Sequence, residues 1–248
     1  MAGRLMAKLK KTLQREGLLG TVKKAVVKLY TRIMDQTPAR RRAKRLKEQE
    51  DREFDRQFNV QTAGFVPLDR LGFGSGNKDH GFAYDPIDPT RFNRTVGSLE
   101  LQHEDFVFID FGSGKGRSLL LASQLPFKKI IGVEFSPELH AVAEQNVRTF
   151  KSDGQRCKEI ELVCADAAEY PLPPVPTVVY FFNPFGAEVM ARVIANVRKS
   201  CLEHPRELYV VYVTPVVDEL WAQADFVMQV ASQKGYCSVY RARTQSPG

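Results

Sequence analysis

The feature that most constrains the fold is a regular alternation of apolar runs and amphipathic stretches after Leu99. A short, continuous apolar run bounded by turn-forming residues is typical of a buried strand in a parallel sheet. We expect strands at residues 106–111, 128–135, 160–166, 177–184 and 207–214, with helices at residues 117–123, 137–150 and 186–202. Strands that alternate with helices form crossover units, so this pattern predicts a parallel sheet with helices on both faces.

The last part of the chain predicts a different kind of pairing. Residues 226–243 contain two apolar runs joined at Lys234-Gly235, a dipeptide that suits a tight turn. Because strands joined by a short turn run in opposite directions, we expect a hairpin at the edge of the sheet. The predicted fold class is α/β: a seven-stranded, mostly parallel sheet with an antiparallel C-terminal edge pair, preceded by a basic helical N-terminal extension.

A glycine-rich loop, DFGSGKGRS at residues 110–118, follows the first of these strands. It matches neither of two phosphate-binding patterns, because Gly116 stands where one requires Ser or Thr and Arg117 stands where the other requires glycine. Its glycines let the backbone approach a ligand closely, and Asp110 places a carboxylate beside them. A carboxylate repels pyrophosphate but pairs with an ammonium group. We therefore expect a nucleoside cofactor with an amino-acid tail and no phosphates.

Polar side chains also end the next three strands. Glu134 lies 134 − 110 = 24 residues after Asp110, where an acid accepts hydrogen bonds from both ribose hydroxyls. Asp166 ends the third strand, placed to meet the exocyclic amine of adenine, and Asn183 ends the fourth. Ligands of open α/β sheets bind outside the carboxyl ends of the strands, so we expect these four side chains to form one site.

These segments resemble the class I S-adenosylmethionine-dependent methyltransferases, which have a Rossmann-like fold. DFGSGKG, GVEF, CADAAEY and FFNPF are similar to the first, second, adenine-binding and fourth motifs of that class, and the similarity covers about residues 80–245. The first motif, together with the upstream FDRQFNVQTAGFVPLDRL, looks most like a bacterial branch whose substrate is generally unassigned. The resemblance implies S-adenosyl-L-methionine as the cofactor and transfer of its methyl group to an acceptor.

The resemblance also implies roles for individual residues. Asp110 and the glycines hold the methionine moiety, Glu134 the ribose and Asp166 the adenine, while Tyr84 closes over the cofactor. The implied cofactor-binding residues are Tyr84, Asp110, Gly112, Ser113, Gly114, Gly116, Glu134, Phe135, Asp166, Ala167 and Asn183.

Asn183, Pro184 and Phe185 are the implied catalytic residues, beside the methyl donor. Direct displacement at a sulfonium methyl group requires alignment more than acid–base catalysis. Asn183 and a neighbouring backbone carbonyl accept hydrogen bonds from an amine or amide nitrogen and leave its lone pair aimed at the methyl group, while Phe185 forms an apolar wall. The segment departs from the NPPY pattern of amide and adenine methyltransferases, so the accepting atom stays open.

Charge is distributed unevenly along the chain. Residues 1–47 carry a net charge of 15 − 2 = +13, whereas the remaining residues carry 21 − 27 = −6. Apolar residues recur at helical spacing in this basic arm, interrupted by Gly17 and Gly20, so we expect two short helices. They either cover the catalytic body or bind an anionic membrane or nucleic acid. A non-catalytic protein that keeps the cofactor fold and docks through this arm is the alternative function.

We divide the chain into a basic helical extension at residues 1–60, a loop-rich lid at 61–98 and the methyltransferase domain at 99–248. The four cysteines are widely spaced and the four histidines lack metal-ligand spacing, so we expect no metal site and no disulfide framework. No apolar run is long enough to span a membrane, and no secretory signal opens the chain. These features favour a cytoplasmic location, with peripheral membrane association left open. The methyl acceptor and the oligomeric state are not predicted.

Overall fold

The computed structural model describes residues 37–67 and 83–243. The chain divides into two compact units, Met1–Glu50 and Asp51–Gly248, so the boundary falls within helix α2 (Pro38–Phe58). Helix α2 begins at a proline, whose fixed φ suits the first turn of a helix. Its side chains from Pro38 to Glu50 are all exposed. The two short helices expected within the basic arm lie outside the described residues.

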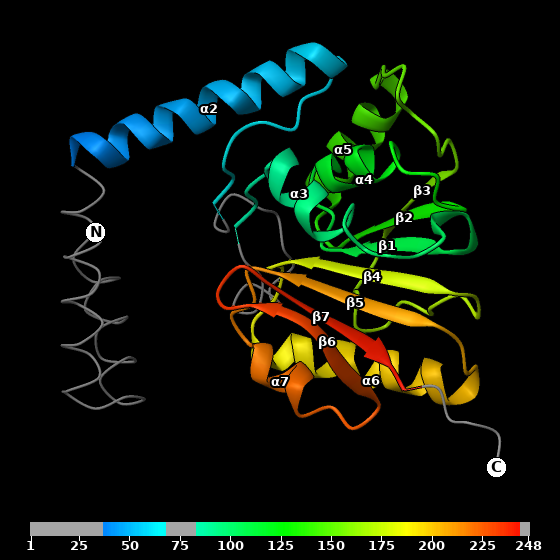
Figure 1. Cartoon of the computed structure of the whole chain (residues 1–248). Coiled ribbons are helices and arrows are strands. Elements are labelled where there is room, and N and C mark those ends of the chain that lie inside the picture. The colour runs from blue at the N-terminus through cyan, green and yellow to red at the C-terminus, as the bar shows by residue number, and fades with distance from the viewer. Residues whose placement is uncertain (1–36, 68–82, 244–248) are drawn as a thin grey trace, which may run out of the picture. The chain divides into compact units, whose positions relative to one another are not determined.

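The second unit is built on a seven-stranded sheet with the order β3-β2-β1-β4-β5-β7-β6 (Figure 1). Its strands are β1 (Val107–Phe111), β2 (Lys129–Glu134), β3 (Ile160–Cys164), β4 (Thr177–Phe182), β5 (Leu208–Val213), β6 (Val227–Gln233) and β7 (Cys237–Ala242). Strands β1 to β5 pair in parallel, whereas β7 pairs antiparallel with both β5 and β6. The predicted mostly parallel sheet with an antiparallel C-terminal edge pair is confirmed.

Helices cover both faces of this sheet (Figure 1). On one face lie α3 (Pro89–Thr95), α4 (Arg117–Ala122) and α5 (Pro137–Thr149), and on the other α6 (Ala187–Glu203) and α7 (Asp218–Ala222). A short 3-10 helix, His103–Asp105, leads into β1. Along β1, Phe108 packs in the core that contains α4, whereas Ile109 and Phe111 pack in the core that contains α6 and α7. Because both faces are covered, the strand reads as a continuous apolar run.

The C-terminal hairpin turns where the sequence predicted. Strands β6 and β7 flank a turn in which Gly235 has a φ of +70°, a left-handed conformation that glycine adopts without steric strain. The amide of Tyr236 closes the turn by donating to the carbonyl of Gln233 at 2.9 Å.

The order of the strands determines where a ligand site can form. Strands β2 and β3 lie on one side of β1, while β4 and β5 lie on the other, so the strand order reverses between β1 and β4. In open α/β sheets the crevice at such a reversal, at the carboxyl ends of the strands, is the usual ligand site. Phe182 at the end of β4 pairs with Val213 at the end of β5, which places Asn183 and Thr214 after neighbouring strand ends.

Candidate functional site

A cavity of about 330 Å3 lies at the carboxyl ends of the parallel strands. Its wall contains most of the residues expected at the cofactor and catalytic sites: Tyr84, Asp110, Gly112, Ser113, Gly114, Glu134, Phe135, Asp166, Ala167, Asn183, Pro184 and Phe185. Gly116 does not line the cavity, and instead forms the N-cap of α4 with a φ of +84°. Residues as distant in the sequence as Tyr84 and Phe185 therefore meet around one cavity, and β1, β2, β3 and β4 each contribute their carboxyl ends to its wall.

The glycine-rich loop after β1 is packed too closely for side chains at two positions. Gly112 and Gly114 have φ values of +84° and +56°, in the left-handed region that favours glycine. A Cβ atom on Gly112 would lie 2.5 Å from Cβ of Pro184, and one on Gly114 would lie 2.4 Å from Cδ2 of Tyr84. The loop is thus held against two other parts of the cavity wall, one after β4 and one ahead of β1.

Asp110 presents a buried carboxylate to the cavity. Its Oδ2 accepts a hydrogen bond from the hydroxyl of Ser118, while its Oδ1 has no hydrogen-bond partner within the described part of the chain. Burial raises the pKa of Asp110 to about 7, and the nearby Glu134 carboxylate adds to this rise, against the opposing hydrogen bond from Ser118. An unpaired carboxylate oxygen in this setting is suited to a cationic ligand, because a nearby positive charge favours its ionised form.

Glu134 ends β2 and supports the same loop. Its Oε2 accepts the amide hydrogen of Gly114 at 2.8 Å, and its Oε1 accepts that of Ser136 at 2.7 Å. Burial raises the pKa of Glu134, whereas these backbone hydrogen bonds lower it. An ionised carboxylate has about four acceptor positions, so each oxygen keeps capacity for a further donor such as a hydroxyl group.

Asp166 lies after β3 in a more open part of the wall. Its Oδ1 accepts the amide hydrogen of Ala168 at 2.9 Å, and its Oδ2 lies 3.3 Å from Nη1 of Arg192. Ala167 beside it is buried, while Phe135, after β2, is 38% exposed. At this end of the cavity, apolar side chains therefore lie beside a carboxylate whose Oδ2 forms an ion pair with Arg192.

Asn183 is held in an unusual backbone conformation after β4. Its φ is +46°, in the left-handed region that asparagine tolerates better than most residues. Its Oδ1 is buried and has no hydrogen-bond partner within residues 37–67 and 83–243. Ser113 Oγ, also in the cavity wall, is buried and unpartnered in the same way. Buried polar atoms are normally hydrogen-bonded, so these atoms are suited to a bound ligand.

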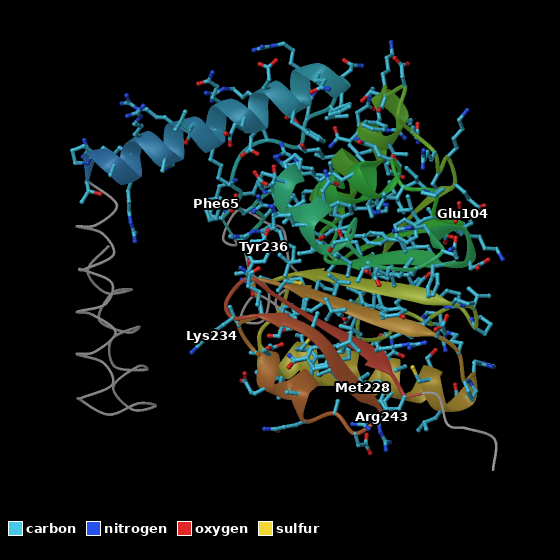
Figure 2. The ribbon with its side chains drawn as sticks, viewed as in Figure 1. Phe65, Glu104, Met228, Lys234, Tyr236 and Arg243 are labelled. Carbon is cyan, nitrogen blue, oxygen red and sulfur yellow. The ribbon has the colours of Figure 1, made fainter. Side chains whose placement is uncertain are left out.

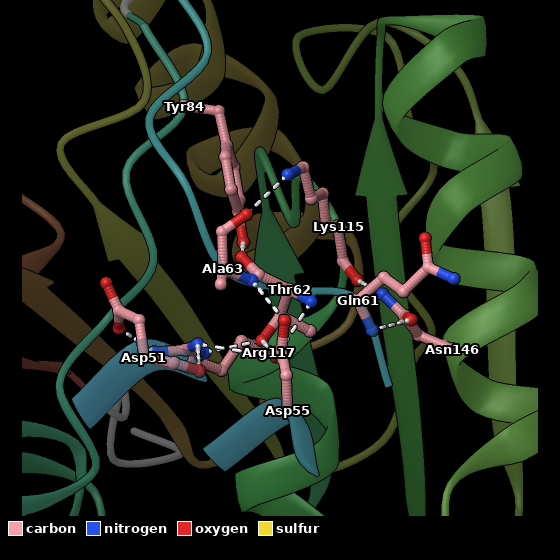
Figure 3. A network of polar contacts seen from close by, with 9 residues as sticks. All are labelled: Asp51, Asp55, Gln61, Thr62, Ala63, Tyr84, Lys115, Arg117 and Asn146. Atoms are coloured by element: carbon pink, nitrogen blue, oxygen red, sulfur yellow. Dashed lines mark hydrogen bonds and ion pairs between the residues drawn. The ribbon is translucent and has the colours of Figure 1, made fainter. Parts of the chain in front are cut away.

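A polar network connects the glycine-rich loop to the segment that follows α2 (Figure 3). The Tyr84 hydroxyl donates to the carbonyl of Thr62 at 2.7 Å, and Nζ of Lys115 donates to the carbonyl of Ala63 at 2.8 Å. Lys115 Nζ also lies 5.0 Å from the centre of the Tyr84 ring, within the range of a cation–π contact. The tyrosine that packs over Gly114 is therefore fixed by residues well ahead of β1.

Arg117 is the centre of this network (Figure 3). Its side chain is 2% exposed and forms ion pairs with Asp51 and, at 3.6 Å, with Asp55. Its Nε donates to the hydroxyl of Thr62 at 2.7 Å, and its guanidinium lies 4.5 Å from the centre of the Phe54 ring. The charge of Arg117 is therefore balanced by acidic residues within the fold.

Several residues of the cavity wall were not expected from the sequence, and Arg91 and Thr214 are two of them. Arg91 lies in the first turn of α3, and its Nη1 donates to Oγ1 of Thr214 at 2.8 Å. Thr214 lies at the carboxyl end of the strand expected at residues 207–214, as Asp166 and Asn183 lie at the ends of theirs, and this is the one signal that points to Thr214. Nothing in the sequence around Arg91 distinguishes it from the other arginines of the chain.

Comparison with known proteins identifies the domain. Residues 108–203 match the family model described as a methyltransferase domain. Residues 108–203 are thus a methyltransferase domain, and the sheet that contains them has the Rossmann-like strand order. The domain match supports a methyltransferase activity with S-adenosylmethionine as the cofactor. No curated protein sequence matches the chain.

Several solved methyltransferase structures are similar to this one. A SAM-dependent methyltransferase from Aquifex aeolicus is 16% identical, with 64% of this chain and 100% of that chain covered and a TM-score of 0.45. The ribosomal protein L11 methylase from Lactobacillus delbrueckii subsp. bulgaricus is 14% identical, with 73% and 99% covered and a TM-score of 0.47. TrmK of M. capricolum, in complex with S-adenosyl-homocysteine, is 13% identical, with 64% and 70% covered and a TM-score of 0.42.

The part of the chain that the structure describes has neither a metal-binding cluster nor a membrane-spanning helix. No group of three or more His, Cys, Asp and Glu side chains there is arranged to hold a metal ion. The same residues include no helix that is long and apolar enough to cross a membrane. All four cysteines are free thiols.

Proposed function

We propose that this enzyme transfers the methyl group of S-adenosylmethionine to an amine or amide nitrogen held against Asn183. The observation that carries this proposal is the buried, unpartnered Oδ1 of Asn183 in the wall of the cavity. Leaving such an acceptor without a hydrogen bond costs about 1–3 kcal/mol, so a ligand that donates an N–H group there is favoured. An amine or amide nitrogen offers that donor and also has the lone pair that receives the methyl group.

The residues around the cavity offer a partner for each polar part of S-adenosylmethionine. The free Oδ1 of Asp110 would pair with the cofactor's ammonium group. Glu134 would accept hydrogen bonds from the two ribose hydroxyls, because each of its oxygens has a lone pair beyond the one that binds a backbone amide. Asp166 would accept the exocyclic amine of adenine. The cofactor supplies an activated methyl group on a sulfonium, so the protein's task is alignment.

Asn183, Pro184 and Phe185 would provide that alignment. Asn183 would accept a hydrogen bond from the nitrogen and thereby fix the direction of its lone pair. Pro184 packs against Gly112, which couples the position of Asn183 to that of the cofactor loop. The Phe185 ring lies 6.4 Å from that of Phe181, edge to face, and would form the apolar wall that keeps water from the reacting atoms.

An experiment with two asparagine variants tests this assignment. Asn183→Ala should leave the Kd for S-adenosylhomocysteine within about threefold, yet lower methyl transfer to lysate fractions about 10²-fold, the size of effect expected when alignment is lost. Asn93→Ala, an exposed residue of α3, is the matched control and should change neither quantity. Equal losses of affinity and transfer in Asn183→Ala would show that Asn183 only binds the cofactor.

The chemistry of the labelled product tests the choice of nitrogen. A methyl group on an amine or amide nitrogen survives mild base, whereas a methyl ester formed on a carboxylate oxygen is hydrolysed. Product that loses its label in mild base would contradict nitrogen as the accepting atom, while leaving the methyltransferase activity itself intact.

We further propose that residues 1–47 dock this enzyme on an anionic surface in the cytosol, where its four free thiols suit a reducing environment. Arg40, Arg41, Arg42, Lys44 and Arg45 within this arm are exposed, which supports the proposal. Removal of residues 1–47 should abolish salt-sensitive binding to vesicles with anionic lipid or to RNA, because both depend on neutralised phosphates. Undiminished binding by the shortened chain would refute it.

A further inference from the structure

The charged residues around the cavity are segregated by sign. Asp110 lies near the end of β1, Glu134 ends β2 and Asp166 follows β3, on the side of the sheet proposed to hold the cofactor. Arg91 lies on the other side, bound to the residue that follows β5. The remaining charged residues in the wall are Arg117, which is neutralised by its ion pairs, and Asp85, which is exposed. Since β4 lies between β1 and β5, the positive charge of Arg91 lies beyond Asn183 from the cofactor.

The guanidinium of Arg91 has no acidic partner among the residues that the structure describes. Its Nη1 donates to Oγ1 of Thr214 at 2.8 Å, and its Cζ lies 4.7 Å from the centre of the Tyr236 ring. Tyr236, labelled in Figure 2, lies in the turn between β6 and β7. A guanidinium carries five N–H donors, so one bond to a hydroxyl leaves the others for a ligand.

The partners of Arg91 hold it in a fixed position. Thr214 has a φ of +51°, a conformation that is rare for a β-branched residue and persists only where surrounding contacts enforce it. Here the amide of Thr214 donates to the carbonyl of Tyr236 at 2.9 Å, so the two residues that contact Arg91 also contact each other. A guanidinium fixed in this way binds an oxyanion with little further loss of side-chain freedom.

We propose that the methyl acceptor carries an anionic group, a carboxylate or a phosphate, and that Arg91 binds this group while Asn183 holds the accepting nitrogen. This inference rests on the proposed function and deepens it, because it assigns a substrate class to the same cavity. A planar guanidinium pairs with the two oxygens of either group in a bidentate fashion, and neither neutral nor cationic acceptors would use it.

The carboxylate of the cofactor's own methionine tail is the other source of such an anion. The position of Arg91 argues against it, because its anchor follows β5, whereas the ammonium of that tail is assigned to Asp110 at the end of β1. Decarboxylated S-adenosylmethionine distinguishes the two sources, since it retains the ammonium group and lacks the carboxylate.

The test compares Arg91→Gln with Arg94→Gln, an exposed arginine of the same helix. Full-length protein saturated with S-adenosylhomocysteine is titrated with inorganic phosphate and with acetate at constant ionic strength, and the melting temperature is followed. We expect a saturable rise in the wild type and in Arg94→Gln, and at least a tenfold weaker apparent affinity in Arg91→Gln. Arg91→Lys, which keeps the charge and loses the fork, should be intermediate.

Three results would overturn the proposal. Two are the absence of a saturable anion effect in the wild type and its undiminished persistence in Arg91→Gln. The other is a loss of affinity of Arg91→Gln for S-adenosylmethionine but not for its decarboxylated form, which would assign Arg91 to the cofactor tail. Failure of the proposed function would look different: the wild type would bind the anion at Arg91 but would label no nitrogen.

Discussion

Replacement of Arg117 by methionine is the perturbation whose effect the structure defines best. Methionine retains a flexible apolar side chain that can still pack against Phe54, but it removes the guanidinium from a buried network. That guanidinium is paired with Asp51 and Asp55 and bonded to Thr62, and its side chain is 2% exposed. The variant therefore leaves two acidic groups, one of them buried, without their cation.

The expected magnitude follows from the burial of this pair. Removal of one partner of a buried ion pair costs about 3–5 kcal/mol, because the remaining charge stays desolvated. In a domain of this size about 1 kcal/mol lowers the melting temperature by about 2–4 °C, so we expect a decrease on the order of 10 °C. Arg117 directly follows the glycine-rich loop, and its partner Thr62 also accepts from Tyr84. We therefore expect a weaker affinity for S-adenosylhomocysteine as well.

The assay is thermal and urea unfolding of the full-length chain, followed by the fluorescence of Trp221. This residue is the only tryptophan in the sequence and is fully buried, so it reports loss of the folded sheet. Arg198→Met removes an exposed pair with Asp225 and should leave the transition unchanged. If Arg117→Met and Arg198→Met unfold at the same temperature, the network around Arg117 contributes nothing and the reasoning is refuted.

Three other perturbations test the cofactor site. Glu134→Ala should weaken binding of S-adenosylhomocysteine by a few kcal/mol, because each charge-assisted hydrogen bond lost costs about 1.5–3 kcal/mol. Glu144→Ala, which changes an exposed residue of α5, should leave the affinity unchanged. Equal affinities of the two variants in calorimetry would reject the assignment of Glu134 to the ribose. Gly114→Ala should lower affinity far more than Gly235→Ala, because both glycines have a positive φ but only the first has a ring carbon 2.4 Å from the added Cβ atom. Asp110, whose pKa is about 7, must lose a proton before it can pair with the cofactor's ammonium group. The affinity for S-adenosylhomocysteine should therefore fall about tenfold per pH unit below pH 7 in the wild type, and this dependence should be absent in Asp110→Asn. The same slope in the wild type and in Asp110→Asn would contradict the assignment.

The sheet was predictable because its signals are local. Buried parallel strands are continuous apolar runs, so the expected strand at residues 177–184 corresponds to β4 at Thr177–Phe182, with only the turn residues Asn183 and Pro184 excluded. The grouping of Asp110, Glu134, Asp166 and Asn183 around one cavity also follows from a general rule, since parallel strands deliver their carboxyl ends to the same edge.

The partners of long side chains were not predictable, because they depend on contacts between distant segments. Arg117 lies 66 residues from Asp51 in the sequence, and Arg91 lies 123 residues from Thr214. The sequence around Arg117 is typical of a solvent-exposed helix N-terminus. The Arg117 side chain is buried because residues 51–62, far away in the sequence, contact it through Asp51 and Thr62. The left-handed backbone of Thr214 is likewise imposed by its contact with Tyr236, which the sequence around residue 214 does not indicate.

The most direct test of the central claim is to locate the methyl group of bound cofactor. S-adenosylmethionine labelled with 13C in its methyl group is added to 15N-labelled protein, and nuclear Overhauser effects from that methyl group to protein protons are recorded. If the account is correct, the methyl group gives cross-peaks to the side-chain amide of Asn183 and to the ring of Phe185. Cross-peaks to residues after β3, such as Asp166 and Ala167, with none to Asn183 would contradict it.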